Sequence, residues 1–350
     1  MNEENISLKQ RLDLKVWRKL LPFLKPFRVR FAQVCVVMIL VALVDISIPL
    51  FQRYAVNNFI VPRSTEGLGV FALLYVLMIV VQAALVVALS RGCISIEMYL
   101  SRDLKRAAFV HLQKLPLSYY NKTPVGYILA RVMSDTSKIA TLVGWSLFDI
   151  FWGAAFVLGV FVAMLILNAR LALLVMAVVP IAAILTGIFQ GKILAVNSRV
   201  RSINSRITGA FNEGITGAKT SKTLVIEDLN CREFSQITGN MYKNTLHATR
   251  LNACFVPLVT FFGSLAAAMV LQRGGYLVMG GELDFGMLSA FVSYALVIIE
   301  PIQQTAGIIA ELIATQVNIE RVTNLLEQEL EIEDKPEVVE KYGDCFSPKR

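Results

Sequence analysis

Residues 68–90 read LGVFALLYVLMIVVQAALVVALS, an unbroken apolar run. About 20 apolar residues suffice to cross the hydrocarbon core of a bilayer as a helix. A helix is the expected conformation, because a backbone exposed to lipid must satisfy its own hydrogen bonds. The run lacks the strict alternation of a membrane β-barrel strand. It therefore predicts a transmembrane helix.

Five further runs have the same character, and together they predict six membrane spans. Hydrophobic residues make up 55% of the 350-residue chain and the mean hydropathy is +0.59, which is too apolar for an ordinary soluble domain. The sequence therefore predicts an all-α, polytopic membrane protein with six long transmembrane helices and two helical cytoplasmic extensions. The further runs are Phe31–Phe51, Thr141–Leu167, Leu171–Phe189, Phe255–Leu277 and Phe285–Ile313.

Positive charge is concentrated in four of the seven polar segments that the spans separate. Of the 34 Lys and Arg residues, 30 lie in residues 1–30, 91–140, 190–254 and 314–350. Cytoplasmic loops of membrane proteins retain positive charge. This asymmetry predicts that both termini and two long basic loops lie in the cytoplasm, with the spans in the plasma (inner) membrane. The other three connections hold only Arg53, Arg63, Arg170 and Arg273.

The composition argues against several other classes of function. Basic residues that flank membrane spans explain the net charge of +8, so we expect membrane lipid and no nucleic acid as a partner. The five cysteines fall within spans or on the cytoplasmic side, which gives no reason to expect an extracellular disulfide. No two of them form a Cys-x-x-Cys pair, so the sequence offers no support for a metal site.

The two basic loops share one plan of helix, short break and helix. In residues 91–140 an apolar stripe at helical spacing ends at Pro116, and the helical pattern resumes after Gly126. In residues 190–254 a helix continues from span four, breaks near Glu213–Gly217, and a new helix starts around Ala218 and returns to span five. Such stalks, about 20 helical residues or roughly 30 Å long, predict a partner at their tips. The stripe consists of Leu100, Leu104, Ala108, Leu112 and Leu115.

The two ends of the chain flank the membrane domain, which we assign to residues 31–317. Within residues 1–30, apolar residues around Trp17 recur at helical spacing between basic residues. This pattern predicts an amphipathic elbow helix along the inner leaflet, and a short solvated helix that merely begins span one is the alternative. Residues 318–350 are interpreted as a cytoplasmic helix followed by an acidic linker.

Three stretches, in this order and at these distances, resemble the six-helix transmembrane domain of ATP-binding cassette (ABC) exporters of the multidrug and lipid-flippase type. The resemblance covers nearly the whole chain. The stretches are LPLSYY at 115–120 followed by GYILARVMSD at 126–135, EGITGAKT at 213–220 with Glu227 and Phe234 downstream, and ATQVNIERV at 314–322.

The resemblance implies a mechanism. Short coupling helices at the two breaks would press into nucleotide-binding domains that bind ATP and Mg²⁺, and the stalks would carry the movement of those domains to the spans. The resemblance also implies a dimer of two transmembrane halves, identical or different, in which spans four and five cross to the other half. In physical terms this is a rigid-body switch biased by a ligand on the partner domain.

The resemblance and the residue chemistry nominate coupling residues. The two tyrosines suit a half-wet interface, the two glycines permit a sharp break or a close backbone approach, and the charged groups can pair across the contact. Ordinary turn and helix-surface roles are the alternative, and Arg131 and Asp135 suit bracing within the loop about equally well. The candidates are Tyr119, Tyr120, Asn121, Gly126, Arg131 and Asp135 in the first loop, and Glu213, Gly217, Lys219, Thr220 and Glu227 in the second.

The missing ATPase motifs are the main departure from the family pattern. Gly-Lys occurs once, at Gly191-Lys192 in the foot of span four, and in Gly217-Ala218-Lys219-Thr220 an alanine separates the glycine from the lysine. We therefore expect no catalytic residue and no cofactor on this chain, which would form an ATP-hydrolysing translocase only when joined to a nucleotide-binding domain. A separate membrane subunit, a truncated reading frame and a cut piece of a longer protein all fit.

Polar side chains inside the predicted spans point to a transport pathway, because ionisable groups in a bilayer are costly. Asp45 lies in span one, and Glu300 lies in span six with Gln303 and Gln304 just behind it. We predict that these residues border a central substrate cavity whose acidic lining favours amphipathic cations. Hydrogen bonding between helices, or a wet position near an interface, is the alternative. The sequence does not identify the substrate.

The leading hypothesis is therefore a transmembrane domain of an ABC-type exporter, which forms a dimeric translocation pathway and couples it to nucleotide-binding domains. An ATP-independent membrane carrier is the second class, and the long stalks argue against it. A non-transporting truncated scaffold is the third. Co-purification of an ATPase subunit with this chain would separate the first class from the other two.

Overall fold

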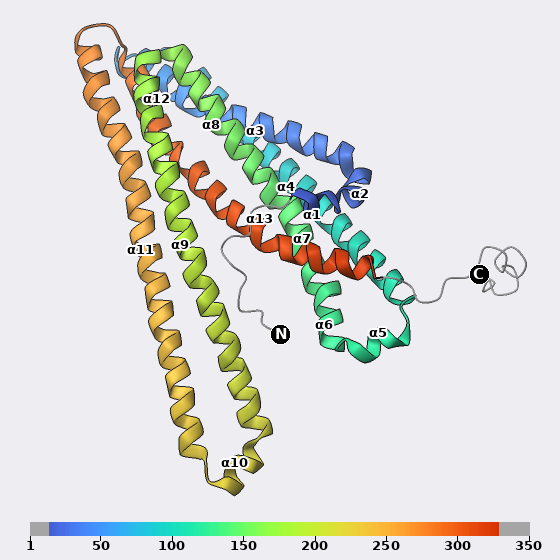
Figure 1. Cartoon of the computed structure of the whole chain (residues 1–350). Coiled ribbons are helices and arrows are strands. Elements are labelled where there is room, and N and C mark those ends of the chain that lie inside the picture. The colour runs from blue at the N-terminus through green and yellow to red at the C-terminus, as the bar shows by residue number, and fades with distance from the viewer. Residues whose placement is uncertain (1–13, 329–350) are drawn as a thin grey trace, which may run out of the picture. The chain divides into compact units, whose positions relative to one another are not determined.

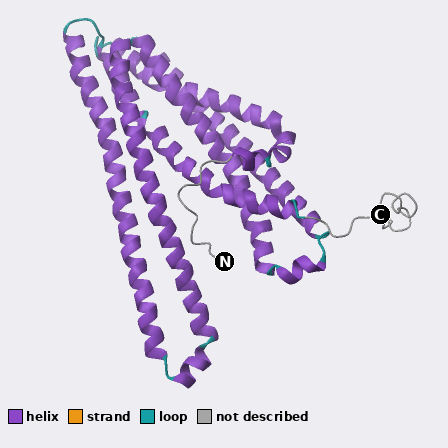
Figure 2. Ribbon diagram, viewed as in Figure 1, coloured by secondary structure: helices purple, strands orange, loops and turns teal. Residues whose placement is uncertain are grey.

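The structure is a computed structural model that describes residues 14–328. Every regular element in this range is a helix (Figures 1 and 2), which confirms the predicted all-α class. The residues before Leu14, and the acidic linker beyond Gln328, lie outside the described part. The elements are α1 (Leu14–Arg18), α2 (Leu21–Leu24), η2 (Lys25–Phe27), α3 (Arg28–Ala55), η3 (Val56–Ile60), α4 (Leu68–Leu112), α5 (Leu117–Lys122), α6 (Val125–Leu129), η4 (Ala130–Asp135), α7 (Thr136–Thr141), η5 (Leu142–Ser146), α8 (Leu147–Leu167), α9 (Ala169–Thr216), α10 (Ala218–Leu224), α11 (Glu227–Met279), α12 (Phe285–Val297) and α13 (Ile299–Leu326).

Between residues 14 and 328, six helical stretches are long and apolar enough to cross a membrane, as the sequence predicts. Most of them extend well beyond the apolar runs, because polar helix continues from the span without a break. At 1.5 Å per residue, the 53 residues of α11 extend about 80 Å, against about 30 Å of hydrocarbon core. The stretches are Leu21–Ile60, Leu68–Leu112, Val125–Leu167, Ala169–Thr216, Glu227–Met279 and Phe285–Leu326.

One compact unit contains Cys35–Leu89 and Phe148–Glu311. Its apolar core is built mainly from α8, α9, α11 and α12. Small side chains, among them Ala172, Ala266 and Ala290, are buried in this core, which lets membrane helices approach closely. The phenol of the buried Tyr294 donates a hydrogen bond to the Ile46 carbonyl oxygen at 2.6 Å, so its polar end is satisfied inside the core.

Within this unit, α9 and α11 run side by side and α10 lies at their tip (Figure 1). Asn168 begins α9 because its side-chain oxygen accepts from the backbone N–H groups of Arg170 and Leu171. Between Val196 and Ala248 the hairpin buries no residue. The two helices therefore cover each other there, and their outer faces stay exposed.

The other compact unit contains Ser90–Leu147, the described part of Gln10–Val34, and residues 312–328 of the described chain. The predicted stripe on α4 is confirmed, because all five of its residues are buried. Cys93 and Ile96, two residues that the prediction did not include, extend the stripe toward the N-terminal half of α4. At the end of α4 the stripe packs against Ile128 and Leu325.

Two predicted element boundaries differ in the structure. The helix that starts at Ala218 does not return to span five, because it ends at Leu224 and the returning helix starts at Glu227. Val225 separates them with a left-handed backbone, at a φ of 52°. Acidic Glu227 and Asp228 occupy the first turn of α11, where the helix dipole favours negative charge.

Span six is divided into α12 and α13 at Ile298. The sequence predicts a disturbance at Pro301, and the division falls three residues earlier. The reason is that a proline lacks the N–H that would bond to the carbonyl four residues before it, here that of Val297, where α12 ends.

Candidate functional site

The tip of the first long loop, residues 91–140, is formed by α5 and α6. The two tyrosines of α5 divide into an inward and an outward residue. Tyr119 packs against the apolar cluster around Leu112 and Leu115, whereas Tyr120 is exposed and donates from its hydroxyl to the Leu112 carbonyl oxygen at 2.6 Å. Their rings meet edge to face with centroids 5.7 Å apart. Tyr119 therefore supports the tip, and Tyr120 lies on its surface.

The outer surface of this tip is apolar. Leu117 is 80% exposed and Val125 is 76% exposed, so each presents almost its whole side chain. Asn121, a predicted coupling residue, is exposed beside them. Gly126, by contrast, lies inside α6 with open space around it, so neither a sharp break nor a close approach requires a glycine there.

Arg131 and Asp135, the charged candidates of this loop, both interact with other described residues. The Arg131 guanidinium lies over the Tyr127 ring at 4.1 Å and donates to its hydroxyl at 2.7 Å. Asp135 is only 4% exposed and interacts electrostatically with Arg321 on α13 as well as with Arg131. Arg131 thus contacts another residue of the loop and Asp135 links the loop to α13, and contact of either residue with a partner stays a prediction.

The tip of the second loop is α10. Gly217 ends α9, and a Cβ there would lie 2.8 Å from the Glu213 carbonyl oxygen of the same helix end. Glu213 contributes that carbonyl, which accepts from the Gly217 N–H at 2.8 Å. Lys219 and Thr220 are exposed on α10. Glu227 pairs with Lys222 at 3.6 Å, which leaves Lys219 with no ion pair among the described residues.

Exposed apolar groups also mark this second tip. Val225 is 81% exposed, and Ile215 and Leu224 are exposed as well. A β-branched residue in the left-handed region costs about 1–2 kcal/mol, and such strain clusters at functional positions. Behind the tip, a groove of about 570 Å³ runs between α9 and α11, where Phe211 and Phe234 meet edge to face with centroids 4.9 Å apart.

The predicted cavity residues fall into two separate sets. Asp45 is held by neighbouring spans, because one carboxylate oxygen accepts from the Gln82 amide and the other from the Trp152 indole N–H at 3.3 Å. This is the hydrogen bonding between helices that the sequence leaves open as an alternative. Three spans thus share one carboxylate.

Glu300 and Gln304 form the second set. Both are exposed, one turn apart on α13, and the Gln304 amide donates to the Glu300 carboxylate at 3.3 Å. Gln303 is half-buried on the same helix. No described contact joins this set to Asp45. Whether these residues border a substrate path stays a prediction.

A carboxylate beyond the apolar run of span two was missed in the sequence. Glu97 on α4 accepts from the Thr141 hydroxyl at 2.7 Å and from the Trp145 indole at 2.9 Å. Trp145 lies in η5, a π-helical turn, and π turns commonly re-aim side chains at functional positions. The only signal for this contact in the sequence was an acidic residue, Glu97, on one predicted helix and a tryptophan, Trp145, on the next.

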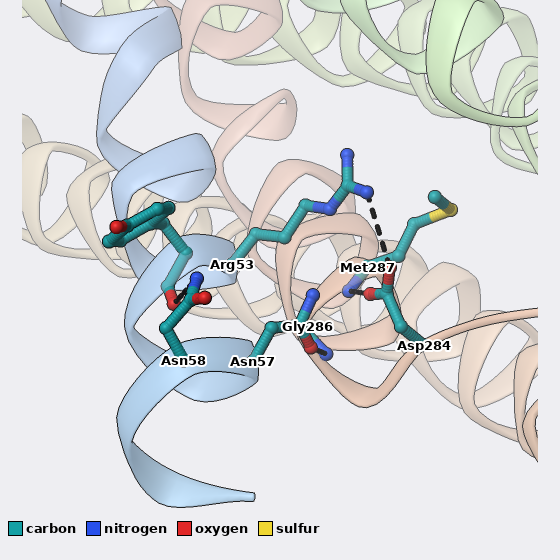
Figure 3. Close-up of polar contacts among 7 residues, drawn as sticks. Arg53, Asn57, Asn58, Asp284, Gly286 and Met287 are labelled. Atoms are coloured by element: carbon teal, nitrogen blue, oxygen red, sulfur yellow. Dashed lines mark hydrogen bonds and ion pairs between the residues drawn. The ribbon is translucent and has the colours of Figure 1, made fainter. Parts of the chain in front are cut away.

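The outer ends of α3 and α12 are joined by a polar clamp, also missed (Figure 3). Arg53 pairs with Asp284 at 3.2 Å, and the Asn57 side-chain oxygen accepts from the Gly286 N–H at 2.8 Å. Asp284 also caps α12, because it accepts from the Met287 N–H. Gln52, next to Arg53 on α3, hydrogen-bonds to Ser289 and Ser293 further along α12. An aspartate directly before the apolar run of span six was the signal for the cap.

Asp284 is held in its ionised form by this clamp. Desolvation by burial raises its pKa, but hydrogen bonds from Asn57 and from the Met287 N–H, together with the charge and hydrogen bond of Arg53, lower it further. The net result is a pKa below the usual value for an aspartate. The clamp therefore stays charged at every physiological pH.

The sequence matches the model of a known protein family. The ABC transporter transmembrane region matches residues 31–302. The chain belongs to this family. The six long helices and two helical tips of the described residues are features that the sequence resemblance implied.

Three curated relatives are similar to this ABC transmembrane region. An uncharacterized ABC transporter ATP-binding protein of Bacillus subtilis, YknV, is 24% identical over 93% of this chain and 54% of its own length. ATP-dependent lipid A-core flippases of Syntrophus aciditrophicus and Desulfotalea psychrophila are 22% and 25% identical, over 95% and 67% of this chain and 55% and 41% of their own lengths. The chain thus spans about half the length of the curated relatives it matches.

We predict that Gly286→Ala destabilises the protein by about 1–3 kcal/mol, because the new Cβ would clash with the Arg53 carbonyl oxygen and the Asn57 side chain. Thermal unfolding of the purified chain in detergent measures the effect. Gly275→Ala on α11 is the matched control, because nothing lies within 4 Å of its Cβ position and alanine favours a helix. Equal melting temperatures for the two variants would contradict the close approach in the clamp.

We predict that Asp284→Asn lowers stability by less than about 1 kcal/mol at neutral pH, because asparagine retains the cap but loses the half-exposed ion pair. The folded pKa is depressed, so the contribution of the charge is full above the unfolded pKa of about 3.9 and is lost as the pH falls through the folded value. The difference between wild type and variant should stay constant from about pH 8 to pH 5. A difference that already shrinks across that range would rule out this role.

Proposed function

We propose that this ABC transmembrane region is the membrane domain of an exporter, and that it carries the movement of ATP-driven nucleotide-binding domains into its spans. The observation that carries the proposal is the pair of cytoplasmic tips. Each is a short helix set between two long ones, and each presents exposed apolar side chains with no partner in the described chain. Leu117 and Val125 do so at the first tip, and Leu224 and Val225 at the second.

Exposed apolar groups on a rigid tip suit a docking surface. Burying them against a partner removes apolar area from water at about 25 cal/mol per Å². The internal contacts of each tip, such as the Tyr120 hydrogen bond and the Lys222–Glu227 pair, hold its shape before docking. A preorganised tip transmits force better than a flexible one, because it does not absorb the movement. Tyr120, Asn121, Lys219 and Thr220 are the polar coupling residues that remain on these surfaces.

We propose a dimer of two such halves. The hairpin of α9 and α11 buries no residue between Val196 and Ala248, and a two-helix arm of that length has no core of its own. A second half, identical or different, would cover the exposed faces. The ATP and Mg²⁺ would lie on the nucleotide-binding domains, either fused or separate, and not on this chain.

The distribution of charge supports the topology. The two long loops, residues 91–140 and 190–254, and the two ends of the chain carry 30 of the 34 basic residues, which favours a cytoplasmic position for them in a plasma (inner) membrane. An ATP-independent carrier and a non-transporting scaffold are not favoured, because neither uses two rigid apolar tips outside the membrane. Relatives named as lipid A-core flippases suggest an amphipathic cargo.

We predict that changes at the second tip separate docking from folding. Val225→Gly removes the exposed side chain and relieves the left-handed strain, so the free energy of unfolding should stay the same or rise by about 1 kcal/mol. Co-purification of a nucleotide-binding domain from native membranes, measured by mass spectrometry, should nevertheless fall. Lys219→Glu should lower it too, because it reverses an exposed, unpaired charge.

Lys243→Glu is the matched control for charge, because it reverses an exposed lysine on α11 away from the tip. Undiminished capture by both tip variants would remove the second tip from the coupling surface. Movement of solutes by liposomes that contain the chain alone, without any ATPase, would replace the proposal with a carrier.

We predict that Glu300→Gln lowers the efflux of cationic dyes by roughly three- to tenfold in the assembled transporter, the effect of losing one partly wet charge interaction of about 1 kcal/mol. Efflux of neutral substrates should not change. Glu282→Gln, on the exposed loop before α12, removes the same charge outside the spans and is the control. If every dye is exported as before, Glu300 is not part of the pathway.

A further inference from the structure

The elbow that leads into span one carries an open groove that the exporter mechanism does not use. Its volume is about 740 Å³, and it is formed within residues 18–31, from α1 to the start of α3. Three of its lining residues are basic and the rest are apolar, and no acidic residue lines it. The lining residues that matter here are Arg18, Lys25, Arg28, Leu21, Leu24 and Phe31.

The basic residues of the elbow divide into two groups. Lys19 pairs with Glu327 at 2.7 Å, and the Arg30 guanidinium lies over the Tyr99 ring at 4.3 Å and donates to the Ser95 hydroxyl at 3.2 Å. These contacts attach the elbow to α13 and α4. In contrast, the three basic residues of the groove have no ion pair with any described residue, and all three are exposed.

The elbow is anchored on the face opposite the groove. Leu20 and Phe27 are buried, and the Phe27 ring stacks on Tyr99 with centroids 6.2 Å apart. These residues turn one face of the elbow toward α4, so the opposite face, with Leu21 and the groove cations, is the exposed one. Three cations held on one side of an anchored turn lose little side-chain freedom on binding, compared with the same residues on a free tail.

The position of the groove along the chain decides what reaches it. It ends at Phe31, where the first apolar run begins, so it lies at the level where a membrane helix meets the headgroups. Apolar Leu21 and Leu24 lie at this level together with unpaired cations. That combination is complementary to a molecule with an anionic head and an apolar chain, and such molecules are concentrated in the cytoplasmic leaflet.

We propose that this groove is a binding site for one anionic phospholipid of the leaflet that the elbow contacts. Its phosphate lies among Arg18, Lys25 and Arg28, and an acyl chain lies along Leu21, Leu24 and Phe31. The cytoplasmic sidedness rests on the proposed topology, whereas the site itself needs only the membrane. The lipid would hold the elbow against α4 at the base of span one, next to the contacts of Lys19 and Arg30.

The test is photo-crosslinking with the full chain in vesicles of phosphatidylcholine that contain a minority of phosphatidylglycerol. One preparation carries a diazirine on the phosphatidylglycerol and a second carries it on the phosphatidylcholine, and peptide mapping locates the label. We expect labelling of residues 18–31 to favour phosphatidylglycerol. Each Lys or Arg near an anionic surface contributes about fivefold to binding. The triple variant Arg18→Gln, Lys25→Gln and Arg28→Gln should therefore reduce the preference for phosphatidylglycerol at least tenfold, and at most by about the product of three such fivefold factors.

The matched control is the triple variant Arg199→Gln, Arg201→Gln and Arg206→Gln. It removes the same charge from exposed positions on the α9 arm, far along the chain from the elbow, and should leave the preference unchanged. Raising the salt concentration should weaken the preference of the wild-type chain, which tests the role of charge without any substitution.

An unchanged preference in the elbow variant, or one that is insensitive to salt, would overturn the proposal. The proposal would also be overturned if the elbow variant kept its preference for phosphatidylglycerol but no longer captured the nucleotide-binding domain, because the groove would then serve a protein partner. The readout needs no ATPase, so it is independent of the exporter proposal. Normal transport without the lipid preference removes only the lipid site, and a retained preference without transport removes only the exporter function.

Discussion

The lack of hydrogen-bonding partners in the bilayer is the constraint on which this structure depends. A peptide backbone in hydrocarbon must bond to itself, so each apolar run becomes a helix, and the helix has no reason to stop where the lipid stops. The polar continuation of α4, α9 and α11 keeps the same hydrogen-bond ladder in water. Long stalks are therefore a direct extension of the spans, and a movement at a tip acts on a continuous rod.

Polar side chains in the spans and just beyond their apolar runs join neighbouring helices through hydrogen bonds. Asp45, Glu97 and Asp284 each accept hydrogen bonds from residues on other helices, and none is left without a donor. A carboxylate shared in this way joins helices at a defined point. Apolar packing alone distinguishes helix rotations weakly in lipid, because lipid chains are as apolar as leucine. These contacts therefore set which faces meet.

The tips of the two long loops follow the opposite rule, since they keep apolar side chains exposed. Leu117 and Val225 expose almost their whole side chains, and Val225 also has a strained, left-handed backbone. At the same time Tyr119 and Asp135 are turned inward and hold the first tip in shape. A tip with a packed interior and exposed apolar side chains is suited to binding a partner. The elbow groove is similar, because its anchored turn presents exposed basic side chains.

The sequence by itself determined the six spans, the stalks, the stripe on α4 and the existence of two breaks. These properties depend on hydropathy and on a period of 3.6 residues, which are local and survive without knowledge of the neighbours. Only the tertiary structure decided that Glu227 pairs with Lys222, that Tyr119 packs on the apolar cluster whereas Tyr120 is exposed, and that Arg53 meets Asp284 across 231 positions. Such contacts depend on how helices cross and rotate, and that geometry leaves no periodic trace in a single sequence.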